Sequence, residues 1–178
     1  MLIASWTKTF RAQKAMAERA LVQVTDADLH RDLAPGVNPI AVIMKHLHGN
    51  MRSRWVDFLT SDGEAPDRNR DDEFVDDHAD RATIMRRWEE GWGYLFTALE
   101  GLTDEDASRT VTIRGEPHTV ADAINRQVSH YAHHVAQIVL MCRIFVGDES
   151  WQWLSVPPGG SKAFNASMAK KFPGFGGS

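Results

Sequence analysis

The sequence predicts an all-α fold, a four-helix bundle with one short hairpin before the last long helix and a C-terminal extension packed on the bundle. Four segments have the composition or the apolar spacing of long helices. The connections between them are rich in turn-forming residues, and no strong strand pattern occurs. Helices with apolar stripes bury those stripes against one another, which favours a bundle.

Length and composition limit the organisation of the chain and its partners. The 178 residues suit one domain, which we place at residues 1–165, with residues 166–178 as a flexible tail. A net charge of -4 disfavours nucleic acid as a partner. No apolar run has the roughly 20 residues that a membrane span needs, and the first residues lack an apolar signal core, so we expect a cytoplasmic protein without membrane contact.

The first two helices are expected at residues 6–24 and 38–60. Good helix formers fill the first segment, which ends where TDAD and LAPG bring turn residues. In the second, Asn38 is a suitable cap and Pro39 suits the first helical position. Its apolar residues form one stripe: Ile40, Ile43, Met44, Leu47, Met51, Trp55 and Phe58.

A polar segment at residues 61–77 then predicts a long loop, a kind of loop that is often functional. The third helix, about residues 80–100, has Gly101 as its stop, and Gly91 and Gly93 within it indicate close backbone packing. Its core face has five apolar residues: Ile84, Trp88, Trp92, Leu95 and Leu99.

The last long helix follows a short hairpin at residues 109–119. Thr119, with Asp122 three residues later, is typical of a helix start, and the apolar register continues to about Val146. Beyond this helix, Trp151 and Trp153 indicate that the first part of the tail packs against the bundle.

Histidines provide the main chemical signal. Five of the eight lie in two helical clusters, KHLHGN and SHYAHH: His46, His48, His130, His133 and His134. Residues four apart share a helix face, so His130 and His134 can reach one ion, whereas His133 points away from the core. A third ligand must come from another helix, and geometry alone leaves both His46 and His48 as candidates. Cys142 is the only cysteine, which excludes a cysteine-rich zinc cluster.

Most of the chain, from about residue 6 to residue 165, resembles the DinB-like superfamily (DinB/YfiT type), in its uncharacterised DUF1572-type branch. Three segments carry this resemblance: NPIAVIMKHLHGNMRSRWVDFLTSDGE, RNRDDEF and IRGEPHTVADAINRQVSHYAHHVAQIV. The superfamily pattern is a His before a branched apolar residue on the second helix, and HxxxH near a Gly-Gln dipeptide on the fourth. The resemblance therefore implies a metal site of His46, His130 and His134, with His48 as the alternative, although Ala136 replaces the usual Gly.

Three histidines with an open position are typical of a catalytic metal site, because water or substrate can fill the vacancy. Zinc, nickel or ferrous iron would accept these ligands. Asn50, Asn125 and Gln137 are candidates to orient the ligating rings. Arg54 and Arg126 could hold an anionic substrate near the metal, but we expect both to be solvated.

Two further histidines, His30 and His78, lie in polar surroundings and are also expected to be solvated.

The superfamily's thiol-dependent enzymes imply a metal-dependent thiol S-transferase, whose partners would be a small-molecule substrate and a low-molecular-weight thiol such as mycothiol, bacillithiol or glutathione. A metal-dependent hydrolase, in which the ion activates water, is one alternative. A non-catalytic, stress-related metal-binding bundle that dimerises is another. Bundles of this superfamily are often dimeric, so we expect a homodimer.

Overall fold

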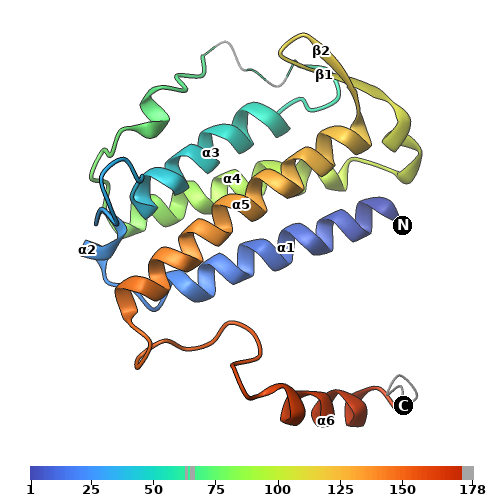
Figure 1. Ribbon diagram of the computed structural model, residues 1–178. Coiled ribbons are helices and arrows are strands. Elements are labelled where there is room, and N and C mark those ends of the chain that lie inside the picture. The colour runs from blue at the N-terminus through green and yellow to red at the C-terminus, as the bar shows by residue number, and fades with distance from the viewer. Residues whose placement is uncertain (63, 65–66, 174–178) are drawn as a thin grey trace.

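The computed structural model describes residues 1–62, 64 and 67–173, and they are mostly helical (Figure 1). This confirms the largely helical fold that the sequence predicts. In chain order the elements are α1 Leu2–Leu21, α2 Asp26–Leu29, α3 Ile40–Trp55, η1 Asp72–Phe74, α4 Arg81–Glu100, η2 Asp104–Ser108, β1 Thr110–Ile113, β2 Glu116–Thr119, α5 Val120–Val146 and α6 Ser161–Lys171.

Four long helices, α1, α3, α4 and α5, surround one hydrophobic core (Figure 1). The most extensive contacts are those of α3 with α4 and of α1 with α5. The largest fully buried side chains come from all four helices and include Phe10, Met44, Trp88, Trp92 and Tyr131. Among the helices in the described part of the chain, none is both long and apolar enough to cross a membrane.

The first helix is displaced from its expected range, because it begins at Leu2 and ends at Leu21. The free N–H of Ile3 donates to the carboxylate of Asp104, 3.0 Å away, and this carboxylate also pairs with the terminal ammonium. An acceptor supplied by a distant segment thus satisfies the helix start. The expected turn at TDAD contains the short helix α2, which is capped at Thr25.

Both predicted ends of the second helix were wrong. Pro39 is the N-cap of α3, with an extended ψ of 163°, and its carbonyl accepts the N–H of Ile43 at 3.1 Å, so Asn38 does not cap the helix. At the other end the helix stops at Trp55 rather than Thr60. Asp57 has a left-handed φ of 52°, which an α-helix does not tolerate.

The predicted third helix corresponds to α4, and its bounds agree. Asp80 caps α4 by accepting the N–H of Thr83 at 2.8 Å, and Gly101 follows its last residue. A Cβ at Gly91 would lie 3.2 Å from the Cα of His48, which confirms close packing of α4 on α3 there. A Cβ at Gly93 would meet no described atom within 4 Å, so the same expectation was wrong for Gly93.

The hairpin is a connector, as predicted. Strands β1 and β2 pair antiparallel from Thr110 with Thr119 to Ile113 with Glu116. Arg114 and Gly115 form the turn, and their N–H groups donate to the carboxylate of Asp62 at 2.8 and 2.7 Å. Directly after the hairpin, Thr119 accepts the N–H of Asp122 and so begins α5.

The C-terminal segment divides into a docked part and a helix that lies away from the four long ones. Trp151 is buried in the core, and the backbone of Gln152 pairs with the side chain of Gln23, which lies two residues after the end of α1. Figure 1 draws α6 apart from the other helices, and all its residues are exposed. The expected tail, residues 166–178, begins inside α6, and residues 174–178 lie outside the described part.

Candidate metal centre

Three imidazole rings converge between α3 and α5. The Nε2 atom of His130 lies 3.4 Å from Nε2 of His46 and 3.1 Å from Nε2 of His134. Two metal-bound nitrogens in a tetrahedral site, with bonds of about 2.0–2.1 Å, lie about 3.3 Å apart. Both measured separations therefore match the spacing of nitrogens around one ion, and the group offers three ligand atoms within 4.8 Å of one another.

Glu73 fixes the orientation of the His46 ring. The Nδ1 atom of His46 lies 2.9 Å from Oε2 of Glu73, and both residues are buried. An ionised carboxylate only accepts hydrogen bonds, so the ring proton lies on Nδ1 and the Nε2 lone pair faces the other histidines. The Phe74 ring stacks on the His46 ring, with 4.8 Å between the ring centroids.

Arg68 holds Glu73 in turn. Its Nε and Nη2 atoms donate to the two carboxylate oxygens at 2.7 and 2.9 Å. Burial raises the pKa of Glu73, but the hydrogen bonds from His46 and Arg68 outweigh it and leave this pKa below its usual value. A Cβ at Gly49 would lie 2.6 Å from Cδ of Glu73, so glycine there gives the carboxylate room beside α3.

Gln137 performs the corresponding role for His134, because its Oε1 lies 2.8 Å from Nδ1 of that ring. Gln137 was one of three residues that the sequence suggested for this purpose. The other two make different contacts: Asn50 accepts the hydroxyl of Tyr131 at 3.0 Å, and Asn125 accepts the indole N–H of Trp6 at 2.9 Å.

His130 and His134 lie in surroundings that favour the neutral imidazole, which is the form that binds metal. Burial, together with His134 and His46, lowers the pKa of His130 to about 3, and burial also lowers the pKa of His134. The Nδ1 atom of His130 is buried and has no hydrogen-bond partner among the described residues. The Nδ1 contacts of His46 and His134 thus leave their Nε2 atoms free to face Nε2 of His130, and the three nitrogens could hold a metal ion.

A cavity of about 360 Å³ adjoins the histidines. His46, His134 and Gln137 form part of its wall. Its remaining lining is mostly apolar: Leu33, Gly36, Val37, Asn38, Ile43, Phe74, Leu140 and Met141. A small molecule in this cavity would thus place an apolar group beside the ring nitrogens.

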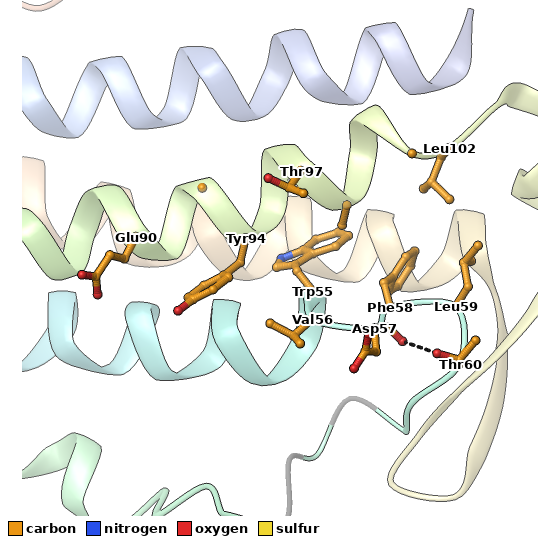
Figure 2. Close-up of a pocket in the computed structure, with 13 residues that line it drawn as sticks. Trp55, Val56, Asp57, Phe58, Leu59, Thr60, Glu90, Tyr94, Thr97 and Leu102 are labelled. Carbon is orange, nitrogen blue, oxygen red and sulfur yellow. Dashed lines mark hydrogen bonds between the residues drawn. The ribbon is translucent and has the colours of Figure 1, made fainter.

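A larger cavity, of about 660 Å³, lies away from the histidine group, between the end of α3 and α4 (Figure 2). Phe58, Leu59 and Tyr94 are among its lining side chains, and Thr60 donates to the Asp57 carbonyl at its edge. None of the groups of converging ligand atoms in the described residues lies there. Chemistry depends on convergent polar groups more than on volume, so we place the site at the histidines.

The structure separates the neighbouring histidines that geometry left open. His46 joins the group, whereas His48 faces α4, with its Nε2 3.5 Å from the carboxylate of Glu90. His133 is exposed, as predicted. Sequence reasoning did not find Glu73 and Arg68, because they lie in the loop at 61–77, where no periodicity indicates which side chains turn inward.

Of the two arginines expected to be solvated, Arg126 is exposed but Arg54 is buried. The sequence gives no signal for this difference. Arg54 follows Asn50 by one helical turn and so shares its inward face.

Comparison with known proteins gives a family. A family model described as a protein of unknown function, DUF1572, matches residues 2–160. The chain belongs to the DUF1572 family. The match extends over the four long helices, the hairpin and the docked part of the C-terminal segment, so all three converging histidines of this DUF1572 chain lie within it. No curated protein and no solved structure matches the chain.

Proposed function

We propose that this protein binds one divalent metal ion through His46, His130 and His134, within a four-helix bundle of the DinB-like kind. The observation that carries the proposal is the orientation of the rings. Two of the three Nδ1 atoms bond to protein oxygens, Glu73 for His46 and Gln137 for His134, so their Nε2 lone pairs face inward. Zinc, nickel and ferrous iron suit three imidazole ligands.

The proposed centre is open, which suits catalysis better than a purely structural role. Three protein ligands leave at least one position for another molecule. The adjoining cavity of about 360 Å³ would admit a small substrate. When bound, the ion supplies a Lewis acid that lowers the pKa of a thiol or water.

Transfer of a thiol is the reaction that we favour, with a metal-dependent S-transferase as the proposed activity. A thiol has a pKa of about 8.5, against about 15.7 for water, so it needs little help to ionise. Hydrolysis benefits from a free general base. Glu73, the carboxylate bonded to this centre, already has both oxygens engaged by Arg68 and His46.

The protein's own residues would position the reactants. Glu73 and Gln137 keep the rings in the ligating tautomer, and Phe74 covers one side of His46. Apolar side chains such as Ile43 and Met141 would bind the apolar part of the electrophile and exclude water from it.

Metal analysis tests the ligand set. Protein purified without chelators should contain about one equivalent of metal, and His130→Ala should lose it. His133→Ala is the matched control, because this exposed histidine lies on the same helix. Unchanged metal content in His130→Ala, or equal losses in both variants, would contradict the ligand assignment.

Cobalt substitution then tests the reaction class. Cysteine, glutathione and other cellular thiols should change the visible spectrum of the cobalt protein if sulfur binds the ion. If every thiol leaves the spectrum unchanged in a protein that holds cobalt, the S-transferase proposal fails and hydrolysis or simple metal binding replaces it.

A further inference from the structure

A buried arginine with two unpartnered nitrogens lies farther along the helix that carries His46. Arg54 is 5% exposed, and its Nε and Nη1 atoms are buried. Neither atom has a hydrogen-bond partner among the residues that the structure describes. An unpaired buried charge is costly, and proteins normally pair or neutralise it. Burial, together with the neighbouring Arg126 and Arg68, lowers the pKa of Arg54, but an arginine remains protonated at neutral pH.

Glu64 and Asp62 interact electrostatically with Arg54, and both carboxylates are already engaged elsewhere. Asp62 accepts the backbone N–H groups of Arg114 and Gly115 at 2.8 and 2.7 Å. Glu64 pairs with Arg114 at 3.1 Å and with Arg68 at 3.5 Å. Glu73 is bound by Arg68 and His46.

Other groups that act on Arg54 do not neutralise it. They are Arg68 and Arg126, which add positive charge, and the hydroxyl of Tyr131, which bonds to Trp55 and Asn50. The Arg54 guanidinium therefore has no directly bonded counterion among the described residues, and a bound metal ion would add positive charge to this region.

Arg54 lies on the same face of α3 as the metal centre. His46, Asn50 and Arg54 follow at four-residue intervals, so they form one row, with about 12 Å of helix rise between the first and the last. His46 meets His130, and Asn50 meets Tyr131. Arg126 acts electrostatically on both His130, which meets His46, and Arg54, so one side chain influences both ends of this row.

We propose that Arg54 binds a carboxylate of the same small molecule whose donor atom occupies the open position at the histidines. This inference rests on the proposed metal centre and defines its ligand as a thiol that also carries an acid group. A carboxylate suits Arg54 because its oxygens accept charge-assisted hydrogen bonds from the guanidinium N–H groups. The Oε1 atom of Gln127 on α5 is also buried and unpartnered among the described residues, and it could accept an N–H or O–H of this ligand.

Two thiols of equal length test the proposal on the cobalt-loaded protein. 6-Mercaptohexanoate and 6-mercaptohexanol bury the same chain and differ only in the acid group. We expect the wild type to bind the acid at least tenfold more tightly, as followed by the cobalt spectrum, and Arg54→Met to bind both equally. Arg52→Met is the control, because Arg52 is an exposed residue of the same helix that pairs with Asp67, and it should keep the preference.

A second measurement needs no metal. Hexanoate should raise the Tm of the metal-free wild type more than hexanol does, and Arg54→Met should lose this difference. Arg54→Met should itself have a higher Tm than the wild type without ligand, because it removes an unpaired buried charge. A purely structural arginine would give the opposite sign.

These outcomes separate the two proposals. A protein that binds no cobalt contradicts the metal centre, and the hexanoate measurement still decides the role of Arg54. A protein that binds cobalt, but shows the same preference for acid in the wild type and in Arg54→Met, overturns the role of Arg54 and leaves the metal centre standing.

Discussion

In the part of the chain that the structure describes, two clusters bring histidine nitrogens and other ligand atoms within 4.8 Å of one another, and they differ in the partners of their ring nitrogens. The first is His46 with His130 and His134. In the second, formed by His30, Asp76 and His78, Nδ1 of His30 lies 2.8 Å from the Asp76 carboxylate and its Nε2 lies 3.1 Å from the Ala79 carbonyl. Both nitrogens of that ring face protein oxygens, so neither directs a lone pair at a shared point.

The second cluster therefore holds the loop at residues 76–79 in place. His30 ends α2, and its hydrogen bonds hold residues 76–79 against that helix end, which corrects the expectation that His30 is simply solvated. His78 is 80% exposed, as expected, and its N–H donates to Asp76 at 2.8 Å. The two clusters thus have similar proximity, and the partners of their ring nitrogens are what distinguish the candidate metal site from the second cluster.

The largest expected effect separates the two clusters directly. His46→Ala should weaken zinc affinity by more than roughly a hundredfold, because loss of a ligand exceeds the 10- to 100-fold cost of losing a residue that only orients one. His30→Ala should leave zinc affinity unchanged. Competition with a chromophoric chelator measures both constants, and a greater loss in His30→Ala would reverse our assignment of the two clusters.

A smaller effect should follow from the carboxylate that holds each ring. Glu73→Gln removes the charge behind His46 and should lower zinc affinity by about 10- to 100-fold. The matched change, Asp76→Asn, alters the carboxylate behind His30 and should have no effect on zinc. The same chelator competition applies, and equal affinity in Glu73→Gln and the wild type would show that Glu73 does not orient a metal ligand.

The smallest effect concerns the pH dependence of the metal-free protein. The pKa of His130 is lowered to about 3 by burial and neighbouring histidines, so in the folded state this ring stays neutral at pH values where the unfolded chain takes up a proton. Its contribution to stability is therefore full above the unfolded pKa of about 6.5 and is lost as pH falls below that value. Between pH 7.5 and pH 5.5 the free energy of unfolding should fall by about 1 kcal/mol from this group.

Urea unfolding with a chelator present, at several pH values, measures this loss. His130→Gln should have a shallower pH dependence than the wild type, while His78→Gln, which changes the exposed histidine of the second cluster, should follow the wild type. Parallel curves for His130→Gln and the wild type would mean that His130 is not held neutral by its surroundings.

Local patterns predicted part of this molecule well. The predicted bounds of the third and fourth long helices agree closely with those of α4 and α5. The caps at Asp80 and Thr119 and the stop at Gly101 depend only on neighbouring residues, so the sequence indicates them directly. The prediction for the second helix was wrong at both ends, because Pro39 and Asp57 adopt backbone conformations that the surrounding fold fixes.

For the site, the amino-acid sequence determined that His130 and His134 share a helix face and that His133 does not, because helix geometry alone fixes those directions. Helix geometry left His46 and His48 open as the third residue, the family resemblance favoured His46, and the tertiary structure brought His46 to this pair. It also turned Glu73 inward from a loop and buried Arg54 with two nitrogens that have no hydrogen-bond partner among the described residues. These facts depend on how α3 rotates against α4 and α5 and on the path of residues 61–77, and contacts between residues far apart in the chain set both.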